Sequence, residues 1–165
     1  MDIDVRSLSN RDVLNLWSDA MVEMRRRDLV RTNNVVGELA EAIVHAHFGG
    51  VRGTFVEKGW DVRTDDGIRI QVKGMRRTVD TRKKAGTVYD GAYDALVIIV
   101  FGPKFELLAA YETTPSVVER MFKWSERLKG RAPTVTQRFV NDPEVSELDL
   151  SAAYELVLST ALPLP

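Results

Sequence analysis

The chain has 165 residues, 44% apolar and 28% charged, which is typical of a globular domain long enough to bury its own core. Its formal net charge of −1 creates no overall basic field, so any affinity for nucleic acid has to come from a local patch. Cysteine is absent, which excludes disulfides, thiolate metal sites and cysteine catalysis. We expect a single cytoplasmic domain, 1–165, with no membrane partner, because the N-terminus lacks a signal pattern and the longest apolar run, 95–101, is too short to span a bilayer.

Two helices are predicted in the N-terminal part of the chain. Ser9 and Asn10 precede apolar residues at helical spacing, which predicts a capped amphipathic helix that ends near residue 29. A second helix is expected over 34–48, because a pair of glycines follows it. Its apolar residues share one stripe, and the opposite stripe carries three polar side chains: Glu38, Glu41 and His45.

The remainder of the chain is predicted to alternate between strands and helices. Strands are expected at 54–57, 60–63, 68–73, 92–101, 105–112 and 135–139, and helices at 115–128 and 151–158. The apolar run that ends at residue 101 indicates a central strand buried on both faces. This order predicts an α/β sandwich around a mixed sheet of four or five strands, flanked by helices, with an extra N-terminal helix in 1–30.

The segment 59–74 reads GWDVRTDDGIRIQVKG and predicts a β-hairpin. In its second strand, the apolar side chains of Ile70 and Val72 alternate with polar ones, so the two kinds point to opposite faces. Gln71 and Lys73 are therefore expected to lie side by side on one polar face.

The turn of this hairpin decides which face Asp61 joins. A two-residue loop would place Asp61 opposite an apolar partner, whereas a three-residue loop, 65–67, places it opposite Gln71. A glycine at the end of the longer loop suits its left-handed last position. The longer loop also buries both apolar neighbours of the aspartate, Trp60 and Val62. We therefore expect three polar side chains to converge on one surface: Asp61, Gln71 and Lys73.

Basic residues are concentrated in 69–84, which holds seven basic side chains and one acidic one and so carries a charge of +6. The candidates for phosphate contact are Arg69, Arg76, Arg77, Arg82, Lys83 and Lys84. Because this segment begins on the hairpin strand, we interpret it as an arm that contacts nucleic acid. The alternative interpretation is a solvated loop, which is the usual place of a charge run.

An aspartate followed by Gln-x-Lys on the next strand resembles the core motif of the PD-(D/E)XK nuclease superfamily. Asp61 and 71–73 carry this resemblance, which is similar to the D…QxK variant of Mrr-like restriction endonucleases. The superfamily also places an acidic residue on the helix before its first core strand. Glu41 is the preferred match to that position.

The resemblance extends beyond the motif. The string over 31–77 resembles small uncharacterised prokaryotic nuclease-like domains, and 78–112 match by topology only. The resemblance implies a restriction-endonuclease-like sandwich, with the nuclease core at 31–112. The segments 1–30 and 113–165 would add an N-terminal helix and a C-terminal helix and tail.

The resemblance also implies phosphodiester hydrolysis that depends on Mg²⁺ or Mn²⁺. Such an ion prefers hard oxygen ligands, neutralises charge on the phosphoryl group and activates water. Asp61 would be the principal ligand, joined by Glu41, the Gln71 side-chain oxygen and the Val72 backbone carbonyl. Lys73 would orient the attacking water or stabilise developing negative charge.

Three functions remain open from the sequence. The leading hypothesis is a metal-dependent endonuclease acting on nucleic acid, with DNA as the expected substrate and defence or repair as the expected setting. The second is a nuclease-like fold that has lost catalysis and binds nucleic acid or protein, which Gln71 favours because it carries one charge less than glutamate. The third is a structural domain with an incidental polar strand face. A homodimer through the apolar tail 158–165 is also left open.

Other polar residues have simpler interpretations. We expect Glu38 to lie on a solvated helix face. The arginines at 25–27 and Arg31 are expected to interact with the dipole at the end of the first helix, and a second contact with DNA is the alternative. His45 and His47 lie two residues apart on a helix and point in different directions, so zinc ligation is not expected. His45 could pack, cap or contact substrate.

Overall fold

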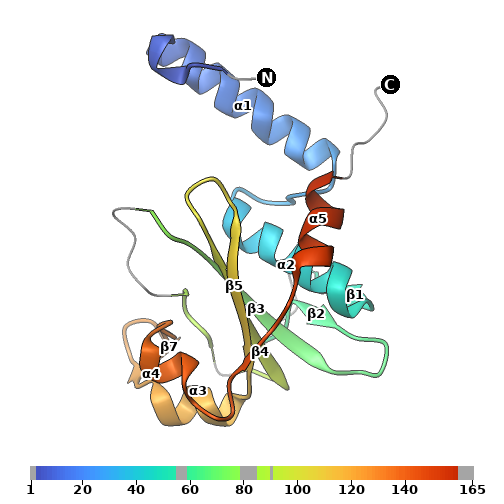
Figure 1. Ribbon diagram of the computed structural model, residues 1–165, viewed down its shortest axis with the longest axis vertical. Helices are drawn as coiled ribbons and strands as arrows, with labels where there is room; N and C mark the ends of the chain where they lie inside the picture. Colours follow the sequence, from blue (N-terminus) through green and yellow to red (C-terminus); the bar gives the residue numbers. More distant parts are fainter. Residues whose placement is uncertain (1–2, 55–58, 79–84, 90, 160–165) are drawn as a thin grey trace.

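The computed structural model describes residues 3–54, 59–78, 85–89 and 91–159, and Figure 1 shows their arrangement. The helices are η1 (Val5–Ser7), α1 (Asn10–Arg26), α2 (Val35–Phe48), α3 (Pro115–Met121), α4 (Gln137–Val140) and α5 (Ser151–Ser159). The strands are β1 (Val51–Arg52), β2 (Val62–Arg63), β3 (Arg69–Arg76), β4 (Ala95–Phe101), β5 (Leu107–Thr113), β6 (Trp124–Ser125), β7 (Gly130–Arg131) and β8 (Ser146–Glu147). Within these described ranges, every helix is too short or too polar to cross a membrane.

Six strands form one mixed sheet in the order β1-β2-β3-β4-β5-β8, and β6 pairs with β7 in a separate ribbon. β3 and β4 run parallel, whereas the other neighbouring pairs are antiparallel. Every residue of β4 is buried, because strands flank it on both sides and other elements cover both faces. This position explains why the sequence of β4 is apolar throughout.

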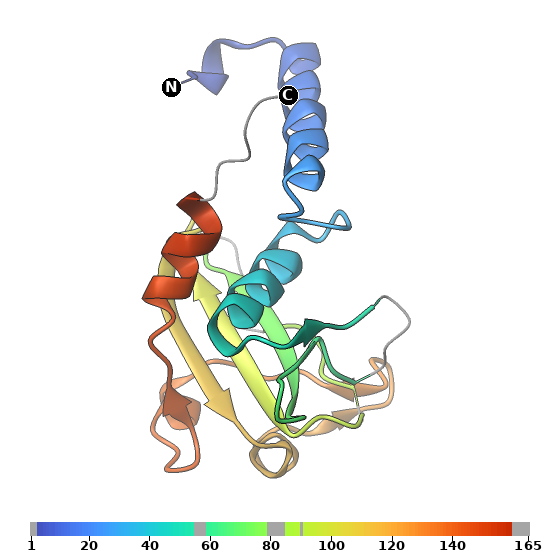
Figure 2. The same ribbon diagram turned by 90° about the vertical axis from the view of Figure 1, so that its right-hand side faces the viewer.

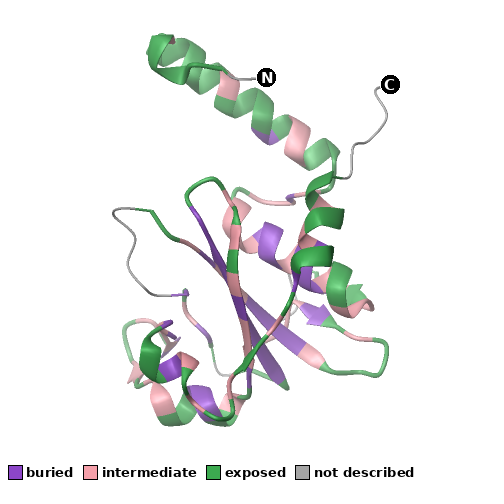
Figure 3. Cartoon of the chain, viewed as in Figure 1, coloured by how far each residue is buried: buried purple, intermediate pink, exposed green. Residues whose placement is uncertain are grey.

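Helices cover both faces of the sheet and create two separate cores (Figures 1 and 2). On one face, α2 and α5 pack onto strand residues that include Ile70, Val72 and Val97. On the other face, α3 and α4 contribute Val118 and Phe139 to a second cluster. Figure 3 shows the buried residues concentrated in the strands between these layers.

The mixed α/β class and most long elements agree with the sequence predictions. The Asn34 side chain caps α2 by accepting from the Gly37 N–H, and Gly49 ends the helix with a φ of 70°. β4 and β5 form the expected antiparallel pair. α5 occupies the place of the predicted C-terminal helix.

Three predictions of local structure are wrong. The sheet has six strands rather than four or five, because β1 and β8 have only two residues each and are too short to produce an alternating pattern. The strand expected at 135–139 is replaced by α4, since the Thr136 side chain caps a helix by accepting from the Phe139 N–H. α3 is much shorter than the helix expected over 115–128, and β6 follows it. The strand expected at 54–57 falls mostly outside the described residues.

A glycine in β3 lets α2 approach the sheet closely. A Cβ atom at Gly74 would lie 2.5 Å from the Val36 backbone oxygen and 3.1 Å from the Ala40 Cβ atom. The first separation is shorter than real Cβ contacts, so any side chain here would push α2 away from the sheet. This close approach holds Glu41 of α2 near the strand that carries Lys73.

Gly74→Ala is expected to lower the free energy of unfolding by about 2 kcal/mol, because the added methyl group overpacks the contact between α2 and β3. Denaturant titration measures this change. Gly102→Ala is the control, since a Cβ atom there meets only the flexible Glu106 side chain, and it should cost much less. Equal costs at the two positions would contradict the close approach.

Candidate functional site

The hairpin of β2 and β3 closes in the predicted register. Val62 lies opposite Ile70, and the Thr64 N–H donates to the Ile68 carbonyl oxygen at 2.9 Å. The three-residue loop ends at Gly67 with a φ of 93°, a conformation that glycine adopts without strain. This register brings the aspartate that precedes β2 alongside β3.

Asp61 is attached to β3 by its backbone and its side chain. Its N–H donates to the Ile70 carbonyl oxygen at 2.8 Å, and its Oδ2 accepts from the Val72 N–H at 2.7 Å. The Gln71 Nε2 also donates to Oδ2. Gln71 is only 5% exposed, so these bonds to the carboxylate form where water screens them little.

The face of β3 that carries Gln71 and Lys73 is covered rather than solvated. Ala85 and Val88 pack in the same apolar cluster as Met75, which points to this face from further along β3. The polar groups of β3 therefore lie in a partly enclosed space instead of on an open surface.

Trp60 is not placed as the sequence predicted. It is half-buried and packs against the second apolar cluster, on the opposite side of the sheet from the core that contains Val62. The chain bends at Asp61, and β2 begins only at the next residue, so the alternation of a regular strand does not extend back to Trp60.

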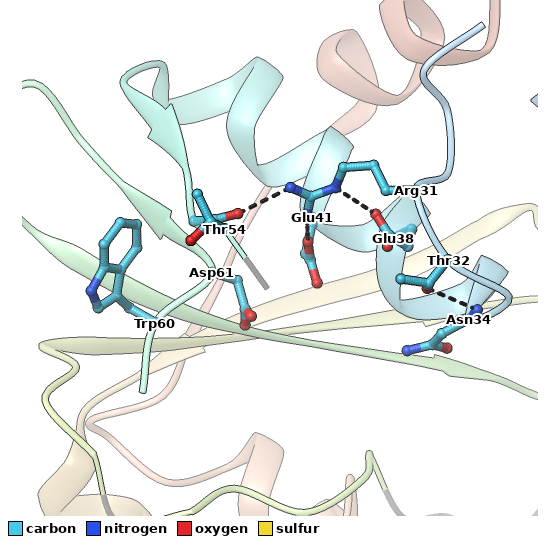
Figure 4. A pocket seen from close by; sticks show the side chains of 9 residues that line it. Arg31, Thr32, Asn34, Glu38, Glu41, Thr54, Trp60 and Asp61 are labelled. Atoms are coloured by element: carbon cyan, nitrogen blue, oxygen red, sulfur yellow. Dashed lines mark hydrogen bonds and ion pairs between the residues drawn. The ribbon is translucent and has the colours of Figure 1, made fainter. Parts of the chain in front are cut away.

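Two arginines bind the two glutamates of α2, and Figure 4 shows the bonds that Arg31 makes to them. Arg31, in the loop before α2, donates from Nε to Glu38 Oε2 at 3.0 Å and from Nη2 to Glu41 Oε2 at 2.7 Å. Arg52 of β1 donates from Nη2 to Glu38 Oε2 at 3.0 Å and to Glu41 Oε2 at 3.4 Å. Glu38 is 3% exposed, so the expectation of a solvated helix face is wrong. Its burial is tolerated because two guanidinium groups compensate its charge.

Glu41 and Asp61 lie between two cavities. One cavity, of about 220 Å³, is lined by both carboxylate residues and by Arg31 and Trp60 (Figure 4). The other, of about 360 Å³, is lined by the same two residues and by Lys73. The carboxylate pair is thus accessible from an arginine side and from a lysine side.

The charges at this site perturb one another. Burial raises the pKa of Asp61, although its hydrogen bonds and the charge of Lys73 oppose the shift. Burial also raises the pKa of Glu41, and the negative charges of Asp61 and Glu38 add to this shift. Burial lowers the pKa of Lys73 against the attraction of both carboxylates. All three groups are shifted towards their neutral forms, a pattern that is common in functional sites.

The basic segment is only partly available to phosphate. Arg69 forms a bidentate ion pair with Asp94, with both N–O distances at 2.9 Å. The Arg76 guanidinium lies over the Phe105 ring, 4.6 Å from its centre. Arg77 is exposed. Three further candidates fall outside the described residues: Arg82, Lys83 and Lys84.

Metal binding at this site would need amide and backbone oxygens as well as carboxylates. In the part of the chain that the structure describes, no group of three or more His, Cys, Asp or Glu side chains is arranged to hold a metal ion. His45 has a local partner, since its Nε2 lies 3.1 Å from the Gly50 carbonyl oxygen, and His47 packs edge-on against Phe48. Glu41 and Asp61 line both cavities and Val72 lines the larger one, whereas buried Gln71 reaches them only through its bond to Asp61.

No family model matches the chain, and no curated protein matches it.

Two residues of the site were not predicted from the sequence. The sequence predicted that Arg31 interacts with a helix dipole, and it predicted no role for Arg52. The available signal was the spacing of Glu38 and Glu41, which places two acids on one side of an otherwise apolar helix and requires counter-charges if they are buried. Arg52, which supplies one of these counter-charges, follows Glu38 by 14 positions and belongs to β1. Only the fold brings the two residues together.

Lys73→Met is expected to raise the free energy of unfolding by about 1 kcal/mol at neutral pH, because the folded protein disfavours the charged amine. The gain should shrink as the pH rises through the lowered pKa of Lys73 towards the ordinary value of 10.5, since lysine then becomes neutral in both states. Urea denaturation across this pH range measures the effect. Lys104→Met at an exposed position serves as the control. A loss of stability in Lys73→Met at neutral pH would contradict the assigned burial penalty.

Proposed function

We propose that the chain is a metal-dependent nuclease with a restriction-endonuclease-like core and a catalytic set of Asp61, Gln71, Lys73 and Glu41. The order of elements supports this proposal, because α2 precedes the antiparallel strands β1, β2 and β3, and β4 lies parallel beside β3. One observation carries it. Asp61, Lys73 and Glu41 come from three different parts of the fold, yet they line one cavity of about 360 Å³. If the polar strand face were incidental, a glutamate from helix α2 would not be expected to lie beside it.

The oxygen donors around this cavity fit Mg²⁺ or Mn²⁺. Burial raises the pKa of both carboxylates, so a cation bound between them would stabilise their charged forms. Asp61 and Glu41 would hold the ion, together with Gln71 Oε1 and the Val72 backbone carbonyl. A bound ion of this kind supplies charge neutralisation at the phosphoryl group and a hydroxide nucleophile near neutral pH.

Lys73 and Gln71 have different roles in this proposal. The lowered pKa of Lys73 brings its amine closer to the neutral form that accepts a proton from water, and its charged form stabilises negative charge on phosphoryl oxygens. Gln71 positions Asp61, because Nε2 donates to Oδ2 beside the Val72 N–H. Both of these bonds end on Oδ2, so Oδ1 is the oxygen that Asp61 would offer to a ligand.

Nucleic acid, with DNA as the expected form, is the proposed substrate, and defence or repair is the proposed setting. The basic segment continues directly from β3, so it would guide a phosphate backbone towards the cavity. Arg77 and the residues at 82–84 are the contacts that we propose. Arg69 and Arg76 already have protein partners and would contribute less.

A second candidate function is a binding module that keeps the fold but does not hydrolyse its ligand. Two hydrogen bonds favour it: the Gln71 amide donates to Asp61, and Arg31 donates to Glu41 at 2.7 Å. Protein donors thus compensate one oxygen of each carboxylate, Asp61 Oδ2 and Glu41 Oε2, without a metal ion. This module would hold nucleic acid or a protein partner.

Cleavage of DNA in Mg²⁺ or Mn²⁺ tests the proposed function. Activity should require the divalent ion and fall by at least about 100-fold in Asp61→Asn and in Lys73→Met, because each change removes a group that acts at the phosphoryl centre. Asp65→Asn is the matched control, since it neutralises an exposed aspartate on the same hairpin and should cleave at the normal rate. Salt-sensitive binding without cleavage would instead support the binding module, and absence of both would contradict both functions.

Gln71→Glu tests the metal site through stability instead of activity. Without divalent ions, the buried glutamate loses a donated hydrogen bond and repels Asp61, so the free energy of unfolding at neutral pH should fall by about 3 kcal/mol. Mn²⁺ should restore much of this loss, because the added carboxylate gains a cation. Gln137→Glu, at the exposed start of α4, should show no response to Mn²⁺. Thermal unfolding measures both variants, and equal losses with and without the ion would contradict metal binding at Asp61.

A further inference from the structure

Asn34 lies at the boundary of the two cavities that flank the carboxylate pair. It lines both of them, as Glu41 and Asp61 do, and it comes from the position directly before α2. The larger cavity is also lined by Lys73 of β3. An uncharged amide group is thus brought next to the two carboxylates that we propose as metal ligands.

The hydrogen bond that caps α2 fixes how the amide group of Asn34 is turned. Oδ1 accepts from the Gly37 N–H at 3.2 Å, so Nδ2 is the other terminal atom of the side chain. A Cβ atom on Gly37 would overlap Nδ2, so the absence of a side chain at this position leaves room for the amide. Figure 4 shows Nδ2 on the same side of Asn34 as Glu41 and Asp61.

The cap of α2 does not require this amide nitrogen. Serine and aspartate cap helices as well as asparagine does, because one side-chain oxygen is sufficient. Asn34 is exposed, and none of the residues that the structure describes accepts a hydrogen bond from Nδ2. Nδ2 is therefore a donor that the fold leaves available beside two carboxylates.

A phosphate group in the larger cavity would bring negative oxygens close to Glu41 and Asp61, so cations or hydrogen-bond donors are needed to offset the repulsion. An amide supplies a donor without adding charge, whereas an aspartate at position 34 would add a further carboxylate. We propose that Asn34 Nδ2 donates a hydrogen bond to a non-bridging oxygen of the scissile phosphate. This role rests on the proposed nuclease function and adds Asn34 to its catalytic residues.

Two substitutions separate this role from capping. Asn34→Asp and Asn34→Ser both keep an oxygen for the cap, so thermal unfolding should occur close to the temperature of the unchanged protein. Both remove Nδ2, so kcat for DNA cleavage in Mg²⁺ should fall by at least about tenfold with little change in KM, because a fixed donor acts on charge in the transition state.

Asn33→Asp is the matched control. It adds the same negative charge one residue away, at an exposed side chain that accepts from Arg25 and lies outside the lining of both cavities. This variant should cleave DNA at the normal rate.

The outcomes distinguish this role from the nuclease function itself. Normal cleavage by Asn34→Ser would overturn the role of the amide even if Asn34→Asp is impaired, because added charge would then explain the loss. A loss confined to KM would also overturn it. If the unchanged protein does not cleave DNA, the nuclease function and this role are both wrong.

Nuclear magnetic resonance gives a measurement that does not depend on cleavage. In Lys73→Met protein with Mg²⁺, which should leave DNA intact, the side-chain amide resonances of Asn34 should shift when a DNA oligonucleotide is added. Adding Asn34→Ser to this protein identifies those resonances, and the amide resonances of Asn15, exposed on α1, should stay unchanged. An Asn34 amide that does not shift at about 1 mM DNA, above the usual range of non-specific dissociation constants, would overturn the proposal.

Discussion

The partial burial of three carboxylates in one small region dictates how the surrounding cations are arranged. Glu38, Glu41 and Asp61 all lose solvation in the fold, and a buried carboxylate is costly unless a cation or hydrogen-bond donor compensates it. The compensating cations come from a loop, from β1 and from β3: Arg31, Arg52 and Lys73. The formal charges of these six groups cancel, so the region is neutral as a whole although each member is strongly charged.

The cost of burial is not compensated equally for the three carboxylates. Burial raises the pKa of Glu38, but bonds from Arg31 and Thr32 outweigh burial and hold it below its ordinary value. The pKa values of Glu41 and Asp61 remain raised, because each is buried and their environments leave part of that cost uncompensated. Glu38 therefore anchors the arginines, whereas the other two acids are where an added positive charge would gain the most free energy. The close approach of α2 at Gly74 holds the two acids together.

The parts of this site that depend on neighbours in the chain could be predicted, and the parts that depend on distant contacts could not. The alternation around Ile70 and the glycine at position 67 were sufficient to predict the hairpin register and the place of Asp61. Arg52 reaches Glu38 only because β1 packs next to α2, and no local pattern encodes that contact. Trp60 was misplaced because a bend interrupts the strand. The edge strands β1 and β8 were missed for a different reason, because two residues are too few to show an alternating pattern.

The charge balance also defines the physical difference between a hydrolase and a binding module on this scaffold. A divalent ion at Glu41 and Asp61 adds two positive charges to a neutral cluster, so a protein cation has to move away or lose its proton. The Arg52 side chain is 13% exposed and belongs to β1, whereas the Arg31 side chain is 25% exposed and belongs to a loop. Arg31 is therefore the less buried of the two arginines, although its contact with Glu41 is the shorter one, at 2.7 Å against 3.4 Å for Arg52. Hydrolysis on this scaffold would depend on whether the free energy of metal binding exceeds the cost of separating Arg31 from Glu41.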